Sequence, residues 1–331
     1  MTAIRASAWQ PQRIPPVIPE EVESCLAELK AFPGADPVTA GIGAMREATR
    51  TRQAAMNIAY APDCAVEEHR LGSSASAPRV RLYAPPRPDG SLLIYIHGGG
   101  FVQGDLDTVD PQCRILAGLT GACVVSLHYR LAPEYPFPAA YNDVIALADW
   151  VAENAERFGF DLARVAVAGE SSGGNLAAVL SAHLAVHGRC RARGQVLVYP
   201  VTDLRCDQNS YVTNAVTPTL TAARMRWYAE QYLARPEDAL DPCASPLLAE
   251  DVSALPPTLL VIAGRDPLAD EGRAYGLRLK EAGVEVTTLE FPELYHGFWG
   301  WGRHLSTTRE LLGLTADFLR HVTRRRDGIP A

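Results

Sequence analysis

The chain has 331 residues, of which 47% are hydrophobic and 21% charged, and its formal net charge is −7. This composition is typical of a globular protein with a large core, and the acidic balance argues against nucleic acid or an anionic membrane as a partner. No stretch reaches the length of a membrane span, and residues 1–16 lack the apolar core of a signal peptide. Seven cysteines without a C-x-x-C pair indicate reduced thiols, so we expect a cytoplasmic protein.

The first expected elements in the chain are two helices. One begins at Pro19, where a proline in the first turn is followed by acidic residues, and the other follows Asp36 and runs towards Met56. They precede every expected strand and have no obvious place in a sheet. We therefore expect residues 1–56 to form cap helices and residues 57–331 to form the main domain.

From residue 64 onward, apolar stretches that read as strands alternate with stretches that read as helices. The expected strands lie at 64–71, 79–83, 92–96, 122–127, 164–168, 195–199, 258–263 and 285–291. The expected helices lie at 111–120, 141–157, 174–187, 271–282 and 307–324, the last with Ser306 as its N-cap. This spacing predicts an α/β fold with a mostly parallel sheet and helices on both faces.

One interval breaks the alternation. Between the strands expected to end at Tyr199 and to begin at Thr258, a helix over 221–233 is surrounded by proline-rich loop. Long insertions are tolerated at an active-site face and often act as lids. We expect an insertion at about 203–245 to pack with the N-terminal helices into one cap.

The segment 165–178 passes from a β-branched apolar run into a helix-forming run through the pattern Gly169-x-Ser171-x-Gly173. A strand that turns directly into a helix places the residue at the bend in a strained backbone, and small neighbours let the two backbones pass closely. The bend exposes a hydroxyl above the helix N-terminus, whose free N–H groups favour an anion. The pattern predicts Ser171 as a nucleophile, whereas the alternative is a glycine-rich turn without chemistry.

The two adjacent serines are distinguished by their neighbours. Glycines bracket Ser171 on both sides, but Glu170 stands where the same pattern around Ser172 would need a glycine. We therefore assign the nucleophile to Ser171 and expect Ser172 to contribute its backbone N–H.

A second glycine-rich segment directly follows the strand expected at 92–96. Its residues are His97, Gly98, Gly99, Gly100 and Phe101. Unshielded backbone N–H groups can point at a substrate oxygen, so Gly98, Gly99 and Ser172 are expected to form a three-donor oxyanion hole. A flexible loop is the alternative, and a phosphate-binding loop is disfavoured because its motifs are absent. His97 is expected to shape the loop.

A nucleophilic serine needs a base and an acid that orients it, and in nucleophile-elbow hydrolases both follow the serine in the chain. His296 stands in a loop just after the last expected strand, where a base can reach Ser171. Asp266 follows the strand 258–263 closely and is the predicted acid. Asp270 is the second candidate, although its position is more typical of a helix cap.

Five motifs together resemble the hormone-sensitive-lipase-like esterases, the bacterial family IV carboxylesterases of the α/β-hydrolase superfamily. They are His-Gly-Gly-Gly at 97–100, Tyr-Arg-Leu-Ala-Pro-Glu at 129–134, Gly-Glu-Ser-Ser-Gly-Gly-Asn-Leu-Ala at 169–177, Asp-Pro-Leu-Ala-Asp-Glu-Gly at 266–272 and His-Gly-Phe at 296–298. The resemblance covers about residues 60–320. It implies an eight-stranded sheet with an antiparallel second strand, a helical cap, hydrolysis of short- to medium-chain carboxylic esters, and no metal or cofactor. It leaves a homodimer open, since many members are dimers.

The chain departs from the usual Gly-Asp-Ser-Ala-Gly-Gly of this family at Glu170 and Ser172. We expect Glu170 to keep a supporting carboxylate role and the Ser172 hydroxyl to alter the pocket wall. The segment 129–134 is expected to be structural, with Arg130 paired to Glu134. Side chains expected to line the substrate pocket are Phe101, Trp227 and Tyr228.

Other functions on the same scaffold stay open at this point. A deacetylase or thioesterase for one metabolite would share the catalytic residues and differ in its cap. A small-molecule receptor, as in the plant gibberellin receptors that resemble this family, would lack the catalytic histidine. Because His296 is present, the sequence favours an enzyme that acts on a small-molecule ester.

Overall fold

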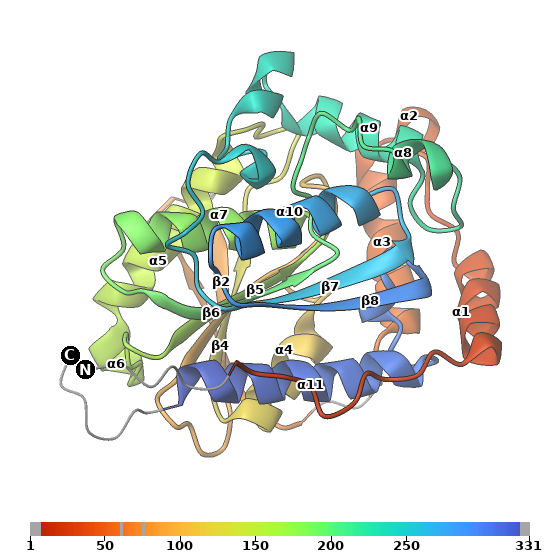
Figure 1. Ribbon diagram of the computed structural model, residues 1–331. Helices are drawn as coiled ribbons and strands as arrows, with labels where there is room; N and C mark the ends of the chain where they lie inside the picture. Colours follow the sequence, from red (N-terminus) through yellow and green to blue (C-terminus); the bar gives the residue numbers. More distant parts are fainter. Residues whose placement is uncertain (1–7, 60–61, 75–76, 325–331) are drawn as a thin grey trace.

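The computed structural model describes residues 8–59, 62–74 and 77–324. Eight strands form one sheet in the order β1-β2-β4-β3-β5-β6-β7-β8 (Figure 1). The strands are β1 (Ala65–Arg70), β2 (Arg79–Ala84), β3 (Leu92–Ile96), β4 (Cys123–His128), β5 (Val165–Glu170), β6 (Ala192–Val198), β7 (Thr258–Arg265) and β8 (Val286–Tyr295). Strand β2 is antiparallel to both neighbours and every other pairing is parallel, which confirms the predicted fold class.

Helices cover both faces of this sheet. One face carries α5 (Ala139–Glu153), α7 (Ser172–Val186) and α10 (Ala269–Glu281), and the other carries α4 (Asp110–Thr120) and α11 (Ser306–Thr323) (Figure 1). The alternation of side chains along β3 explains the two layers: Ile94 packs into one apolar cluster and Leu93 into the other, and both are buried. The helix expected over 141–157 is interrupted, since α5 ends at Glu153 and the short α6 (Ala155–Phe158) follows.

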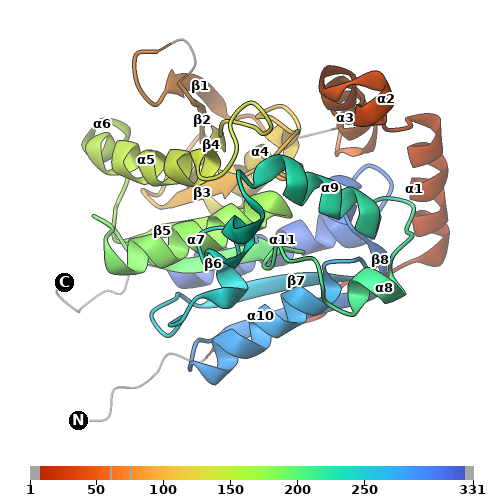
Figure 2. The ribbon, with the colours of Figure 1, turned by 90° about the horizontal axis from the view of Figure 1, so that it is seen from above.

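The N-terminal helices and the inserted segment lie together at one end of the sheet. They comprise α1 (Pro19–Ala31), α2 (Pro37–Ala40), α3 (Ile42–Met56), α8 (Ser210–Thr213) and α9 (Ala222–Tyr232), which are neighbours in both views (Figures 1 and 2). The second expected helix is broken into α2 and α3 at Gly41, whose φ of 83° is incompatible with a continuous helix. Short 3-10 turns follow at η1 (Pro236–Leu240), η2 (Pro246–Leu248) and η3 (Phe298–Gly300).

Arg46 joins α3 to the loops that follow β3 and β4. Its guanidinium forms two hydrogen bonds with Glu134, at 2.8 and 2.7 Å, and donates to the carbonyls of Val102 and Ala132 at 2.8 and 3.1 Å. The expected pair between Arg130 and Glu134 is therefore wrong.

Arg130 instead binds Asp143 on α5, with Nη2 and Nε at 2.6 and 2.9 Å from Oδ1. Asp143 is buried, so it offers Arg130 a better shielded partner than the half-exposed Glu134 would. Glu134 is closer to Arg130 in sequence, but Arg46 from α3 binds Glu134 and Asp143 from α5 binds Arg130.

Ser306 does not serve as an N-cap, contrary to the sequence-based expectation. It is the first residue of α11, and both its backbone N–H and its hydroxyl donate to Oε2 of Glu21 at 2.7 Å. A carboxylate from α1 thus satisfies the free donors at this helix start, where negative charge is favoured. The first and last helices of the described chain are joined by this contact.

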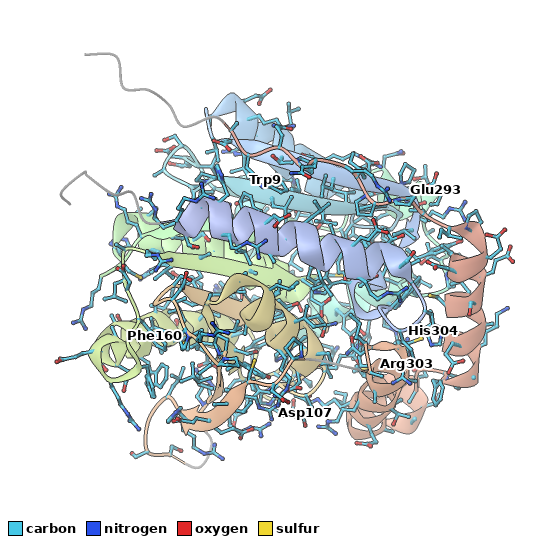
Figure 3. All side chains as sticks on the ribbon, turned by 90° about the horizontal axis from the view of Figure 1, so that it is seen from below. Trp9, Asp107, Phe160, Glu293, Arg303 and His304 are labelled. Carbon is cyan, nitrogen blue, oxygen red and sulfur yellow. The ribbon has the colours of Figure 1, made fainter. Side chains whose placement is uncertain are left out.

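The arm that precedes α1 runs along the underside of the sheet. The Trp9 ring packs edge-on against Phe318 of α11, with ring centroids 5.4 Å apart, and its backbone bonds to Glu285 and Thr287 beside and within β8 (Figure 3). All seven cysteines are free thiols. In residues 8–59, 62–74 and 77–324, no helix is long and apolar enough to cross a membrane. The expected domain limits, 1–56 and 57–331, include residues 1–7 and 325–331 outside the described range.

Candidate active site

The turn between β5 and α7 has the backbone that the glycine pattern predicts. Ser171 lies between the last residue of the strand and the first of the helix, with φ 55° and ψ −121°. A Cβ at Gly169 would collide with the backbone of Gly173, and a Cβ at Gly173 would collide with the carbonyl of Ile96. Glycine at both positions therefore lets strand, helix and neighbouring loop approach closely while the serine side chain is lifted from the sheet.

The structure brings together three of the predicted site residues. Ser171 Oγ lies 2.9 Å from Nε2 of His296, and Nδ1 of His296 lies 2.6 Å from Oδ2 of Asp266. They follow β5, β8 and β7, parallel strands whose carboxyl ends meet at one edge of the sheet. Asp266 is fully buried, and its Oδ1 accepts a hydrogen bond from the Leu268 N–H at 2.9 Å. This chain of contacts suits a serine activated by an oriented imidazole.

The second acid candidate, Asp270, lies elsewhere. It accepts a hydrogen bond from the backbone N–H of Ser210 at 2.8 Å and pairs with Arg273. Asp270 therefore ties α10 to α8 in the inserted segment.

The residues of the predicted oxyanion hole gather around Ser171. Gly98 approaches so closely that a Cβ there would lie 3.3 Å from Cβ of Ser171. Gly99 has a φ of 128°, and a side chain at this position would collide with the carbonyl of Gln103. Ser172 opens α7, so its backbone N–H has no acceptor within the helix. The N–H groups of Gly99 and Ser172 can support negative charge on an oxygen bound at Ser171, whereas the N–H of Gly98 interacts with the Glu170 carboxylate.

His97 and Tyr129 support the glycine loop from beneath. The buried imidazole of His97 stacks on the Tyr129 ring with centroids 4.4 Å apart, and its Nδ1 lies 2.8 Å from the Gly98 carbonyl. Burial lowers the pKa of His97 to about 4, so the ring is neutral near pH 7. The Ser172 hydroxyl is fully buried and lies 3.4 Å from the Tyr129 hydroxyl. The expectation that Ser172 alters the pocket wall is therefore wrong.

Tyr199 is a site residue that sequence reasoning missed. It follows β6 with a φ of 34°, its ring centroid lies 4.5 Å from that of His296, and its hydroxyl donates to Oε2 of Glu170 at 2.8 Å. Burial raises the pKa of Glu170. The hydrogen bond from Tyr199, the charge interaction with His296 and the hydrogen bond from the Gly98 backbone lower this pKa, but by less than burial raises it. Its position at the carboxyl end of a parallel strand was the available signal.

A cavity of about 140 Å³ opens beside Ser171. Of the expected pocket residues, Tyr228 lines it, whereas Phe101 and Trp227 are not among its lining residues. Phe101 is fully buried and stacks on Tyr232 with ring centroids 3.8 Å apart. Trp227 packs against Tyr228 with ring centroids 5.4 Å apart. Phe101 fails as a pocket residue because its φ of 64° turns the ring into the core.

No group of three or more histidine, cysteine or acidic side chains suited to hold a metal ion occurs in the part of the chain that the structure describes. The site thus consists of a hydroxyl, an imidazole, a carboxylate and backbone amides around a small cavity.

Comparison with known proteins places this chain among hydrolases. Residues 93–300 match the family described as alpha/beta hydrolase fold. An ethyl acetate hydrolase of Pseudomonas putida is 39% identical over 264 residues, which is 78% of this chain and 83% of that protein. Esterase LipI of Mycobacterium tuberculosis is 40% identical over 250 residues, 72% of this chain and 77% of that protein.

Solved structures are similar over nearly the whole chain. A hyperthermophilic esterase from the archaeon Pyrobaculum calidifontis superposes with a TM-score of 0.85 at 37% identity, over 92% of this chain and 98% of the other. The similarity therefore extends beyond the sheet to most of the helices around it.

Proposed function

The chain belongs to the hormone-sensitive-lipase-like branch of the alpha/beta hydrolase family and is a carboxylic ester hydrolase, and we propose that it works through an acyl-enzyme formed on Ser171. The observation that carries this proposal is the continuous hydrogen-bonded chain from Ser171 through His296 to Asp266. In this order of contacts, a serine hydroxyl can lose its proton to an imidazole whose opposite nitrogen is held by a carboxylate.

In the proposed mechanism, His296 Nε2 accepts the Ser171 proton as Oγ attacks the ester carbonyl. The carbonyl oxygen becomes negative, and the N–H groups of Gly99 and Ser172 stabilise it. His296 then donates its proton to the departing alcohol oxygen, which leaves the acyl group on Ser171. Asp266 holds the imidazole in the required tautomer and stabilises its charged form.

Water completes the cycle by the same steps in the second half. It attacks the acyl-enzyme while His296 accepts one of its protons, and the proton then passes to Ser171 Oγ as the acid is released. The small volume of the cavity beside Ser171, about 140 Å³, supports short to medium acyl chains. The proposed partner is therefore a small-molecule ester, and the proposed steps use only groups of the protein and water.

The direct test is labelling with a fluorophosphonate probe, combined with 4-nitrophenyl esters of increasing chain length. We expect the probe to react with Ser171 and turnover to fall from short to long acyl chains. Ser171→Ala should lose both the label and about 10⁴-fold or more in kcat.

Ser181→Ala is the matched control for that test, because it removes a buried hydroxyl on the same helix that has no hydrogen-bond partner among the described residues. It should keep the label and most of the activity. Failure of the unaltered protein to react with the probe would refute the acyl-enzyme. Labelling without turnover of any simple ester would point instead to a specific deacetylase or thioesterase.

The assembly and location of the protein are part of the same proposal. The family resemblance supports a homodimer, which light scattering after size-exclusion chromatography would measure. The seven free thiols support a cytoplasmic location, which cell fractionation would test.

A further inference from the structure

A second cavity lies next to the one beside Ser171 and shares part of its wall. It has a volume of about 410 Å³ and lies among residues of α1, α3 and α9, which neighbour one another in Figures 1 and 2. The residues that line both cavities are Leu29, Thr49, Arg52, Gln103, Thr219 and Tyr228. A substrate held at Ser171 can therefore contact these side chains, which also line the outer cavity.

The charge of the outer cavity is opposite to that of the whole chain. Its charged lining residues are Lys30, Arg52 and Arg224, and no acidic side chain lines it among the described residues. The chain itself carries a net charge of −7. A wall with only cations attracts an anionic group of a ligand.

Arg52 is unusual among the arginines of α3. Arg46 binds Glu134 and Arg50 binds Asp105, but Arg52 has no hydrogen bond or ion pair in the part of the chain that the structure describes. Its Nε is buried without an acceptor. Burial lowers the pKa of Arg52, and the charge of Arg224 acts in the same direction, yet a guanidinium stays charged near neutral pH. A cation in this position lacks the partner that partly buried charges normally have.

Further hydrogen-bond donors lie beside Arg52. Thr219 Oγ1 is buried, lines both cavities and has no partner among the described residues. The Tyr228 hydroxyl accepts a hydrogen bond from Gln103 Nε2 at 2.8 Å, which leaves its own proton available. Arg224 contacts the Met45 sulfur at 3.7 Å and the Trp227 ring but forms no ion pair within the described residues.

We propose that the substrate is an ester that carries a carboxylate remote from its scissile bond, and that Arg52, Thr219 and Tyr228 bind this carboxylate. The inference rests on the proposed esterase function and names its substrate class. A carboxylate can accept two parallel hydrogen bonds from a guanidinium and further ones from hydroxyls, so it would satisfy the unpaired donors together. Arg224 and Lys30 would add long-range attraction at the outer end.

The test compares anionic and neutral esters of matched size on the purified full chain. For a carboxylate on the acyl side, the pair is 4-nitrophenyl hydrogen glutarate and 4-nitrophenyl pentanoate. For a carboxylate on the alcohol side, the pair is 4-acetoxybenzoate and 4-methylphenyl acetate. We expect kcat/KM to favour the anionic member of one pair by about tenfold or more, and the pair that shows it identifies the side.

Variants then assign the preference to the cavity. Arg52→Gln should lower the anionic-to-neutral ratio by about tenfold or more, whereas Arg52→Lys should retain part of it because the charge stays. Arg87→Gln removes the same charge from an exposed loop between β2 and β3 and should leave the ratio and the activity unchanged. If Arg52→Gln does not fold, the salt dependence of the unaltered protein decides, because added NaCl should weaken turnover of the anionic ester alone.

Two outcomes separate this inference from the proposed function. Turnover of neutral esters without any preference for the anionic partner, or a preference that survives in Arg52→Gln, would overturn the carboxylate site and leave the esterase intact. Absence of turnover on all four esters together with absence of fluorophosphonate labelling at Ser171 would overturn both.

Discussion

The two halves of the active centre are built in different ways. The half around Ser171 is fixed by backbone geometry: Gly169, Gly173 and Gly99 permit contacts that any side chain would prevent. The cap half, made by α1, α3 and α9, presents side chains such as Arg52 and Thr219 whose polar atoms have no partner among the described residues. The comparison indicates that the backbone specifies the first half, whereas the second presents side-chain donors that the proposed carboxylate would satisfy.

The largest expected effect concerns the acid of the catalytic half. Asp266→Asn should lower kcat by about 10⁴-fold, because the amide cannot stabilise the charged imidazole and favours the wrong tautomer. Asp270→Asn is the matched control, since that carboxylate binds Ser210 and Arg273 instead. Its kcat should stay within a few-fold of the original. Stopped-flow hydrolysis of 4-nitrophenyl acetate measures kcat for both variants. Similar losses of kcat in the two variants would contradict the assignment of Asp266 as the acid that orients His296.

The next effect concerns the seam between the two halves. A Cβ at Gly100 would collide with the Tyr228 ring, and the φ of 61° disfavours any side chain. Gly100→Ala should displace Tyr228 and lower kcat/KM by roughly tenfold to a hundredfold. It should also reduce the free energy of unfolding by about 1–3 kcal/mol.

Gly43→Ala on α3 is its counterpart, because nothing lies within 4 Å of the added methyl group. It should raise the free energy of unfolding by up to about 1 kcal/mol and leave kinetics unaltered. Urea denaturation would measure the free energy of unfolding of both variants, and steady-state kinetics would measure their kcat/KM. Equal values in the two variants would show that the two halves do not meet at Gly100.

A smaller effect is expected where the cap is fastened. Arg46→Gln removes two bonds to Glu134 and two to backbone carbonyls, and should lower the free energy of unfolding by about 1–2 kcal/mol, since Glu134 is half-exposed. Arg13→Gln breaks an exposed pair with Glu310 and should change it by less than about 0.5 kcal/mol. Thermal unfolding followed by circular dichroism gives both values. If Arg13→Gln lowers the free energy of unfolding as much as Arg46→Gln does, the bonds of Arg46 have no special role in holding α3.

The smallest effect is a pH dependence beneath the glycine loop. Burial lowers the pKa of His97 to about 4 and that of His128 to about 3, whereas an unfolded histidine titrates near 6.5. The folded state therefore binds fewer protons, so the free energy of unfolding should be highest above pH 6.5 and fall as the pH drops towards 4. Urea unfolding across that range should show a smaller slope in His128→Gln. If the free energy of unfolding depends on pH in His128→Gln as it does in the unaltered protein, His128 does not contribute to this pH dependence.

The sequence was sufficient to predict that Ser171, Asp266 and His296 lie together, because its signals there are local. Strand, glycine pattern and helix occur within one short segment around Ser171, and Asp266 and His296 directly follow strands whose order was expected. Fold class and sheet were predicted correctly for the same reason, since apolar runs and their spacing specify a parallel sheet.

The cap could not be predicted at this level, because its contacts join distant segments. Arg46 rather than Arg130 binds Glu134, and Glu21 rather than Ser306 satisfies the start of α11. Phe101 was expected in the pocket, but a positive φ directs its ring to Tyr232. None of these partners is near in sequence, so only tertiary packing decides between them.

The anchoring of α3 by Arg46 has one further consequence, which depends on the proposed carboxylate site. The same rigid helix carries Arg46, bonded to the loop that follows the oxyanion glycines, and Arg52, about 9 Å further along its axis. The spacing between the reactive centre and the guanidinium is thus set by one helix rather than by a flexible loop. Such an enzyme would select substrates by the distance between the scissile carbonyl carbon and the remote carboxylate.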